Sequence, residues 1–329
     1  MVMYYCTEVF GFPVYQHITE PSTEVPEDLL EMALDDMHRL AASEPLQYVL
    51  GYTEFCGRRF AVDERALIPR AETEVLCQEA EKLVARPSGG TPSAPRILDL
   101  CTGSGCIAWT LALDLPGAQV VATDLSQDAL DLADSQFRTA SGRPSRLPKG
   151  ALRPRFVKAD LLDVEATVAA AAATVARPSG SQNLSPQSAA QTAPEGACPP
   201  FGRAASGRRI APSSRRGADA PLPAHFGFEL LTANPPYVMV AEKADMRQNV
   251  LGWEPHMAIF APEEDPLVFH KAIAEVAMRV LVPGGSGIVE INSEIPDQTA
   301  AVFTAAGFED IRIIPDYFDR PRFISFRRP

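Results

Sequence analysis

The feature that most constrains this chain is the alternation of short apolar segments with helix-like segments between residues 95 and 329. A chain that repeats strand and helix in this way builds a mostly parallel, doubly wound sheet with helices on both faces, as in Rossmann-like α/β folds. Ligands of such sheets bind at the carboxyl ends of the strands. The strand-like segments read RILDL, QVVATD, RFVKAD, FELLTA, SGIVEIN and FISFRR, and the last is predicted to close the sheet as an edge strand.

The 329 residues are predicted to fall into three regions. Residues 1–50 form a short N-terminal helical region, whose clearest helix covers 26–42 because apolar side chains recur there at helical spacing. Residues 51–94 form a hairpin and helix connector, and residues 95–329 form the α/β domain. A low-complexity insertion at 166–224 interrupts this domain. It is predicted to be disordered because it has too few large apolar side chains to offset the entropy of ordering.

Composition narrows the class of partner. The net charge of −12, from 42 Asp and Glu against 30 Lys and Arg, opposes binding to a phosphate backbone, so we expect no nucleic-acid partner. An acidic surface suits a basic protein partner, although it equally serves ordinary solubility. The six cysteines include no CxxC pair, which favours free thiols and a cytoplasmic protein without a metal site. We expect no membrane span or signal peptide, and a monomer.

A glycine-containing turn follows the first strand of the α/β domain. The stretch ILDLCTGSGCIA ends the strand near Asp99 and starts a helix near Cys106. Such turns let backbone approach a ligand, but they also serve plain strand–helix packing. With Ala108 the stretch fits the loose dinucleotide pattern, so spacing alone leaves a nicotinamide or flavin cofactor open, whereas a P-loop is excluded. The candidate cofactor-binding residues here are Asp99, Cys101, Thr102, Gly103, Ser104 and Gly105.

Acidic side chains end the next two strands. Asp124 terminates QVVATD, where a carboxylate can accept hydrogen bonds from both ribose hydroxyls of an adenosine. Strand-end acids also cap helices, although Ser126 can fill that position here. Asp160 ends the third strand, where it can meet an adenine amino group, and Leu161 follows it.

The fourth strand ends in an unusual corner, Asn234-Pro235-Pro236-Tyr237. Two prolines cannot continue a sheet ladder because neither has an N–H to donate. The corner therefore indicates either a simple turn or a binding site for a planar amide or amine.

Three stretches resemble the HemK/PrmC family: residues 44–76 with the block IPRAETE, ILDLCTGSGCIA, and ANPPYV. The resemblance covers residues 38–165 and 226–329. It implies the class I methyltransferase fold, S-adenosylmethionine as cofactor, and methylation of the glutamine in the Gly-Gly-Gln loop of peptide chain release factors. NPPY is also shared with adenine and cytosine amino methyltransferases acting on nucleic acid, which is the alternative activity.

The resemblance also implies roles for the corner. The side-chain oxygen of Asn234 and the carbonyl of Pro235 accept the two N–H groups of the target amide, and Asn234 also touches the cofactor. Pro235 and Pro236 make the corner rigid, and Tyr237 packs against the flat amide. No general base is needed before methyl transfer, because the product readily loses its proton.

Three departures from the family have consequences. Cys101 stands at the usual first glycine of the turn, so we expect no positive φ there and weakened but retained cofactor binding. Leu161 replaces an aromatic residue beside the adenine, and the N-terminal region is short. A protein that binds cofactor without turnover is therefore the third alternative.

The remaining candidates are weaker. Arg70, Glu72 and Glu74 either shape the cofactor pocket or only begin a helix, and Glu290 is predicted to be structural. The five histidines suggest no triad, and Trp109 and Trp253 are expected in the core.

Overall fold

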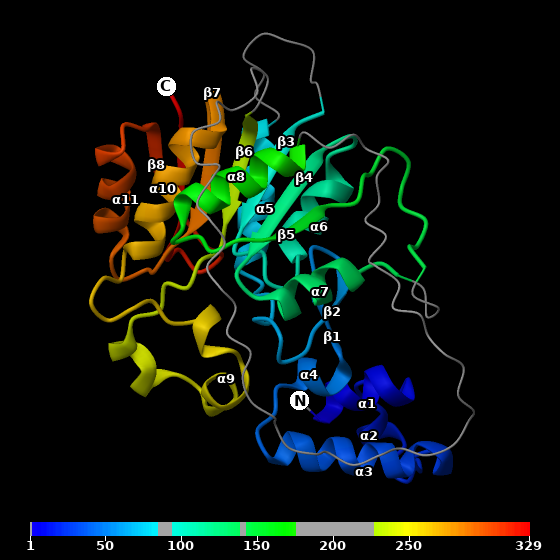
Figure 1. Cartoon of the computed structure of the whole chain (residues 1–329). Helices are drawn as coiled ribbons and strands as arrows, with labels where there is room; N and C mark the ends of the chain where they lie inside the picture. The colour runs from blue at the N-terminus through cyan, green and yellow to red at the C-terminus, as the bar shows by residue number, and fades with distance from the viewer. Residues whose placement is uncertain (1, 85–93, 139–142, 176–226) are drawn as a thin grey trace, which may run out of the picture.

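The computed structural model describes residues 2–84, 94–138, 143–175 and 227–329. Its centre is a seven-stranded sheet with strand order β5-β4-β3-β6-β7-β9-β8 (Figure 1). The first five strands in this order are parallel, and β9 is antiparallel to both of its neighbours. The strands are β3 (Arg96–Leu100), β4 (Gln119–Asp124), β5 (Arg155–Lys158), β6 (Phe228–Ala233), β7 (Leu281–Glu290), β8 (Glu309–Pro315) and β9 (Pro321–Arg327).

The strand order corrects one prediction. FISFRR lies in β9, which is not an edge strand because it pairs with β7 on one side and with β8 on the other. The edge strand is β8, whose sequence EDIRIIP was not recognised as a strand. Most of its side chains are exposed, so its sequence lacks the continuous apolar run that marks a strand buried on both faces.

Helices cover both faces of the sheet (Figure 1). Apolar residues of α8, α10 and α11 pack on one face, against residues such as Leu98 and Leu231. On the other face, α5 and α6 pack against Ile97 and Leu230, and Trp109 of α6 is fully buried there as expected. Successive residues of a strand thus point to opposite faces of the sheet. Because both faces are covered by helices, the strand sequences are continuously apolar. These helices are α5 (Thr73–Val84), α6 (Cys106–Asp114), α7 (Gln127–Ser135), α8 (Val164–Val175), α10 (Val268–Val280) and α11 (Pro296–Ala305).

Helix α8 corrects the start of the insertion. Residues 166–175 were assigned to a disordered segment, but they are helical, and Val168 and Ala171 are buried in the core. Alanine has the highest helix propensity, and the valines supply the packed face. The rest of the predicted insertion, residues 176–224, lies outside the described residues.

The N-terminal region contains more helix than the sequence indicated. The predicted helix is α3, and three shorter helices and a hairpin accompany it. The hairpin of β1 and β2 agrees with the expectation for the connector. The elements are α1 (Val2–Phe10), α2 (Gln16–Thr19), α3 (Glu27–Ala41), α4 (Leu46–Leu50), β1 (Tyr52–Phe55) and β2 (Arg58–Ala61).

A side excursion connects β6 to α10, which leads into β7. It comprises two 3-10 turns, η1 (Val240–Asp245) and η2 (His256–Ala258), and the helix α9 (Gln248–Trp253) between them. In the part of the chain that is described, no helix is both long and apolar enough to cross a membrane.

Candidate active site

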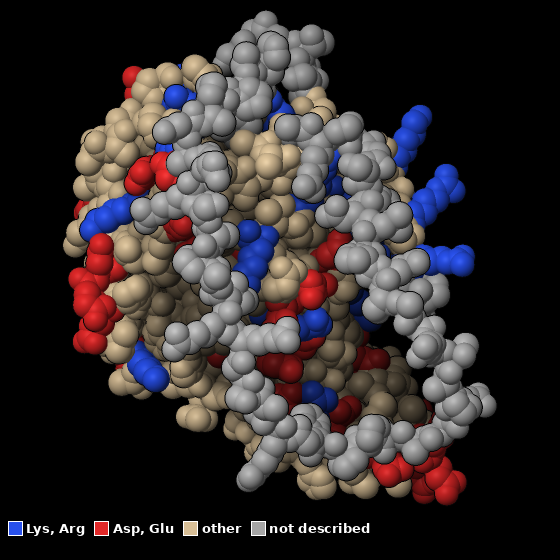
Figure 2. Space-filling view, in the orientation of Figure 1, with Lys and Arg blue, Asp and Glu red and all other residues tan. Residues whose placement is uncertain are grey.

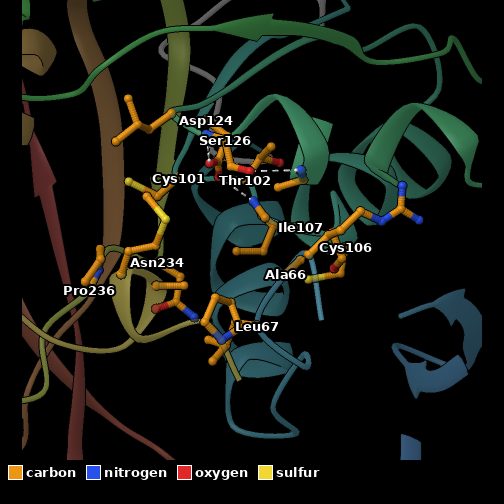
Figure 3. A pocket seen from close by; sticks show the side chains of 18 of the residues that line it. Ala66, Leu67, Cys101, Thr102, Cys106, Ile107, Asp124, Ser126, Asn234 and Pro236 are labelled. Atoms are coloured by element: carbon orange, nitrogen blue, oxygen red, sulfur yellow. Dashed lines mark hydrogen bonds between the residues drawn. The ribbon is translucent and has the colours of Figure 1, made fainter. Parts of the chain in front are cut away.

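A pocket opens at the carboxyl ends of β3, β4, β5 and β6 (Figure 3). The turn after β3, the end of β4 and the corner after β6 all contribute to its lining. Parallel strands place their carboxyl ends at one edge of the sheet, so segments far apart in sequence meet there. Of the predicted site residues, the lining includes Cys101, Thr102, Gly103, Ser104, Asp124, Asp160, Leu161, Asn234 and Pro236. Asp99, Gly105, Pro235 and Tyr237 are not among the lining residues.

The turn after β3 is more strained than expected. Cys101 has a φ of 56°, so the prediction of no positive φ at this position is wrong. The chain turns left-handed again at Gly103, whose φ is 54°. The backbone N–H of Thr102 donates to the carbonyl of Thr123 at 3.0 Å, which holds the turn beside the end of β4. The fold imposes this path on a cysteine, at the usual steric cost of a left-handed residue with a Cβ.

Asp99 lies beneath this turn and is not among the residues that line the pocket. It is fully buried, and its two oxygens accept hydrogen bonds from the hydroxyls of Thr102 at 2.6 Å and Thr232 at 2.7 Å. Burial is the main cause that raises the pKa of Asp99 to about 7, against the opposing effect of the two hydroxyls. The structure therefore places Asp99 in support of the turn, by tying β3 to β6.

Gly105 likewise supports packing. It is the left-handed N-cap of α6, with a φ of 80°. A Cβ at this position would stand 2.9 Å from the Cβ of Ala133 and 3.3 Å from the ring of Phe156. The glycine thus permits close approach of α6 to α7 and β5, whereas a Cβ at Gly103 would meet nothing within 4 Å.

Asp124 connects the turn after β3 with the start of α7. One of its oxygens accepts a hydrogen bond from the backbone N–H of Gly103 and the other from that of Ser126, both at 2.9 Å. Burial raises the pKa of Asp124, against the lowering effect of these bonds. As anticipated, Ser126 is the N-cap of α7, and its hydroxyl accepts from the N–H of Ala129 at 3.2 Å.

The third strand contributes two dissimilar neighbours to the pocket. Asp160 is exposed, and its side chain accepts from the N–H of Leu162 at 3.0 Å. Leu161 is buried and belongs to the core beneath α8 and α10. Leu161 therefore offers an apolar surface to the pocket, and Asp160 a solvated carboxylate beside it.

The corner after β6 faces the same pocket. Asn234 and Pro236 line it, and Figure 3 shows both on the wall near Cys101. Tyr237 is directed elsewhere: its hydroxyl donates to the carboxylate of Glu290 at 2.8 Å. The side chain of Asn292 donates to the carbonyl of Tyr237 at 3.1 Å, which fixes the path of the corner.

Glu290 is the centre of a buried hydrogen-bond network behind Asn234. Its second oxygen accepts from the hydroxyl of Thr73 at 2.8 Å, and the amide nitrogen of Asn234 lies 3.4 Å from that hydroxyl oxygen. Burial raises the pKa of Glu290, while the donors Thr73 and Tyr237 and the charge of Arg322 oppose this shift. Glu290 is thus buried and hydrogen-bonded, and it connects Thr73 with Tyr237 behind the corner.

Sequence reasoning missed several lining residues. Thr73 belongs to the IPRAETE block, but only its charged neighbours were selected from it. Arg70 does line the pocket and forms an ion pair with buried Glu254 at 2.6 Å, whereas Glu72 and Glu74 are absent from the lining. Other missed residues belong to the connector, α6, the start of α7, the excursion and α10, and include Leu67, Pro69, Ile107, Ala129, Pro255, Met257 and Phe269.

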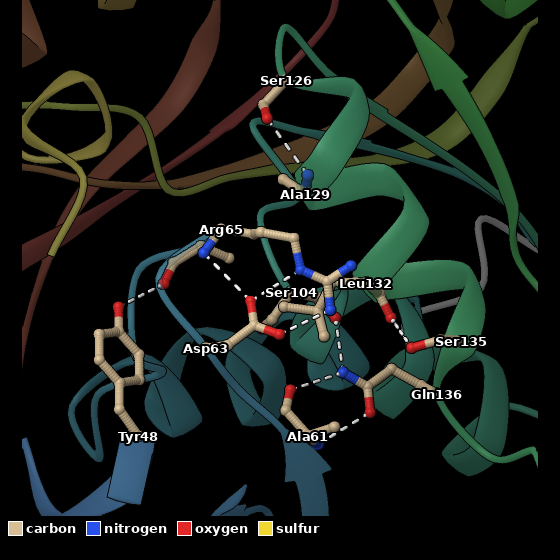
Figure 4. A network of polar contacts seen from close by, with 11 residues as sticks. Tyr48, Ala61, Asp63, Arg65, Ser104, Ser126, Ala129, Leu132, Ser135 and Gln136 are labelled. Carbon is tan, nitrogen blue, oxygen red and sulfur yellow. Dashed lines mark hydrogen bonds and ion pairs between the residues drawn. The ribbon is translucent and has the colours of Figure 1, made fainter. Parts of the chain in front are cut away.

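The hairpin of the connector is attached to the turn after β3 through Gln136 (Figure 4). Its side-chain amide exchanges two hydrogen bonds of 2.9 Å with the backbone of Ala61. The same nitrogen donates to the carbonyl of Ser104 at 3.3 Å. Gln136 therefore keeps the N-terminal connector and the glycine turn in a fixed relation.

The lining residues of the described pocket include no histidine. Among the residues that the structure describes, no cluster of His, Cys, Asp and Glu could hold a metal ion. His270 is buried and hydrogen-bonded to the carbonyl of Glu290, and burial lowers its pKa to about 4. His225 lies outside the described residues. The described part of the pocket combines backbone turns, carboxylates and one amide with apolar side chains such as Leu67, Ile107 and Phe269.

Two curated proteins that are similar to this chain over most of its length carry the same name. The sequence is 31% identical to the release factor glutamine methyltransferase of Bacteroides thetaiotaomicron over 290 residues, which are 88% of this chain and 78% of that protein. It is 33% identical to the protein of the same name from Chlorobaculum tepidum over 283 residues, or 85% of this chain and 74% of that protein. A solved protein-(glutamine-N5) methyltransferase from Alicyclobacillus acidocaldarius is 21% identical with a TM-score of 0.37, covering 82% of this chain and 99% of that one. No protein-family model matches the chain.

Proposed function

We propose, given that the chain belongs to the family of release factor glutamine methyltransferases, that it methylates the glutamine side-chain amide in the Gly-Gly-Gln motif of peptide chain release factors. Its fold is that of class I methyltransferases, and its cofactor is S-adenosylmethionine. One observation carries the proposal: the amide of Asn234 lines the same pocket as the turn at Gly103 and the carboxylate of Asp124.

The residues of the pocket fit this cofactor. Asp124 offers carboxylate oxygens at the end of the second strand, where ribose hydroxyls bind in related folds. Leu161 and Ile107 supply apolar surface for a flat base, and Gly103 leaves open space where a side chain would project. When bound, the cofactor supplies an activated methyl group on a sulfonium sulfur.

The corner residues supply orientation. An amide nitrogen is a poor nucleophile because its lone pair is delocalised into the carbonyl. In this proposal the side-chain oxygen of Asn234 and the carbonyl of Pro235 accept the two N–H groups of the substrate amide, so that its nitrogen faces the methyl group. Pro236 keeps the corner rigid, and Tyr237, which does not line the pocket, anchors the corner through its hydrogen bond to Glu290.

The charge of the protein favours a basic protein partner over a nucleic acid. The chain has a net charge of −12, and Figure 2 shows acidic side chains gathered at the lower right of the molecule. Such a surface attracts basic protein segments and repels a phosphate backbone.

The test is incubation of the protein with tritiated S-adenosylmethionine and either a release factor or duplex DNA. We expect label on the release factor, and loss of this label when its Gly-Gly-Gln glutamine is replaced. Label on DNA alone would support an amino methyltransferase acting on nucleic acid, and label on neither would support a cofactor-binding protein without turnover.

The variant Asn234→Ala separates binding from transfer. We expect it to lower the transfer rate at least about a hundredfold, as removal of a positioned polar group in an active site typically does. Cofactor affinity measured by calorimetry should change little. Full activity of this variant would contradict the role proposed for Asn234.

A further inference from the structure

Three side chains from distant parts of the sequence form a hydrogen-bonded chain that ends at the pocket. Glu290 at the end of β7 accepts from the hydroxyl of Thr73 at 2.8 Å, and Thr73 accepts from the side-chain nitrogen of Asn234 at 3.4 Å. Thr73 is buried at the start of α5 and lines the pocket beside Asn234. The chain therefore connects a buried carboxylate to the amide that faces the ligand.

The order of donors in this chain is set by Glu290. An ionised carboxylate only accepts hydrogen bonds, and here each oxygen already has a hydroxyl donor, Thr73 on one and Tyr237 on the other. Thr73 has a single hydroxyl proton, which it gives to Glu290. Towards Asn234 it can then only accept, so the group of Asn234 that faces it must be the NH₂.

This order determines which end of the Asn234 amide meets the substrate. The nitrogen and oxygen of an asparagine amide are nearly equal in size, so shape alone does not select between the two orientations. With its NH₂ held by Thr73, Asn234 turns its oxygen away from Thr73. The opposite orientation would present N–H donors to a substrate amide nitrogen, which also carries N–H donors.

We propose that Thr73, held by Glu290, is a positioning residue that fixes the side-chain orientation of Asn234, so that its oxygen is the acceptor for the substrate amide. This inference rests on the proposed function, because it concerns the same amide-binding corner. It adds two residues, from α5 and β7, to a site otherwise attributed to the turn and the corner.

The surroundings of Glu290 support a fixed network and not a chance contact. Arg322 of β9 brings a guanidinium nitrogen to 3.5 Å from the hydroxyl of Tyr237. His270 of α10 is hydrogen-bonded to the backbone carbonyl of Glu290 at 3.0 Å. Both groups are anchored on elements of the core, so Glu290 has little freedom to leave Thr73.

The matched variants are Thr73→Val and Thr73→Ser. Valine keeps the shape of threonine but has no hydroxyl, whereas serine keeps the hydroxyl and loses only a methyl group. We expect Thr73→Val to lower kcat for release-factor methylation at least about tenfold, with a smaller change in KM and in cofactor affinity, since an unfixed amide acceptor weakens a polar contact by about that factor. Thr73→Ser should stay within about threefold of the parent protein.

The variant Glu290→Gln provides the second test. Its side-chain amide is similar in shape to the carboxylate, but it can donate as well as accept, so it no longer dictates the direction of the Thr73 hydroxyl. We expect a loss of kcat in the same range as for Thr73→Val. The folding of each variant is checked by its unfolding temperature. If Thr73→Val or Glu290→Gln fails to fold, the other of the two provides the test.

Two outcomes would overturn the inference: parental kcat in Thr73→Val, or an equal loss in Thr73→Ser and Thr73→Val. A failure of the proposed function is recognised separately, because the unsubstituted protein would then transfer no label to a release factor. In that case the inference is decided by NMR of asparagine-labelled protein with cofactor, where the Asn234 amide signal is identified by its loss in Asn234→Ala. A displaced signal in Thr73→Val but not in Thr73→Ser supports the inference, and an unchanged signal in both refutes it.

Discussion

The carboxylate of Asp124 is hydrogen-bonded at 2.9 Å to the backbone N–H of Gly103, across the gap between two neighbouring strands. Its other oxygen accepts from the N–H of Ser126 at the same distance. One side chain thus fixes both the glycine turn and the start of α7, and all three residues line the pocket. Asp124 therefore shapes the pocket in addition to its proposed contact with the ribose.

Replacement of Asp124 by alanine should weaken cofactor binding and lower stability together. A hydrogen bond to a charged group contributes about 1.5–3 kcal/mol, so loss of the proposed bonds to the ribose should lower affinity at least about tenfold. Loss of the bonds to the N–H groups of Gly103 and Ser126 should lower stability. Isothermal titration with S-adenosylmethionine measures the first effect and thermal unfolding the second. The control is Asp131→Ala on the exposed side of α7, which should change neither quantity. An unchanged affinity in Asp124→Ala would exclude the proposed ribose contact.

Replacement of Cys101 by glycine should stabilise the fold. Cys101 has a φ of 56°, which costs a residue with a Cβ about 1–2 kcal/mol, and glycine avoids this cost. The expected gain in free energy of unfolding is up to about 1 kcal/mol, because glycine also forfeits some packing and has a more flexible unfolded state. Urea titration measures it.

Two comparisons test the cause. Cys101→Val should lower stability, because a β-branched side chain tolerates positive φ least. Cys56, with a φ of 47°, is the matched position on the hairpin, and Cys56→Gly should give a similar gain without any change at the cofactor turn. Greater stability in Cys101→Val than in Cys101→Gly would show that packing outweighs backbone strain at this turn.

The sheet and its binding edge were predictable because their signals are local. Apolar runs such as that of β6 are buried on both faces and so need no tertiary context to be recognised. Strand β8 was not recognised because it is an exposed edge strand, and the left-handed φ of Cys101 was not predicted because it results from strand pairing around the turn. Local propensity gives no information on such tertiary constraints.

The site shows the same division. Strand-end residues such as Asp124 and Asn234 could be selected because strand ends converge in a parallel sheet. Thr73 and Glu290 are partners across 217 positions in the sequence, and no spacing rule connects them. Asp99 was selected by the same rule, because it lies near the end of a strand. Its side chain, however, points into the core, where the hydroxyls of Thr102 and Thr232 donate hydrogen bonds to it.

The two glycines of the turn should separate packing from binding. Gly105→Ala places a Cβ 2.9 Å from that of Ala133 and adds strain at a φ of 80°, so we expect a loss of about 2–4 kcal/mol in the free energy of unfolding. Gly103→Ala meets no neighbour within 4 Å and should cost only the strain, about 1 kcal/mol, while its methyl group at the pocket weakens cofactor binding. Equal stability losses in the two variants would contradict this division.

Burial of Asp99 should make stability depend on pH in a specific direction. Its pKa rises from its ordinary value of 3.8 to about 7 on folding, so between these values the folded protein binds a proton that the unfolded chain does not. The contribution of Asp99 to stability is then fully present below about pH 4, falls as the pH rises, and is lost above about pH 7. The cause is burial, since both hydroxyl partners favour the charged form.

The variant Asp99→Asn isolates this contribution. Asparagine cannot ionise, so the difference in unfolding free energy between the parent protein and Asp99→Asn should shift in favour of the variant as the pH rises from about 4 to about 7. Denaturant titrations at closely spaced pH values measure this difference. Asp163→Asn is the control, because Asp163 is exposed at the start of α8 and should leave the slope unchanged. A difference between Asp99→Asn and the parent protein that does not vary with pH would show that Asp99 keeps its charge, stabilised by Thr102 and Thr232, throughout this range.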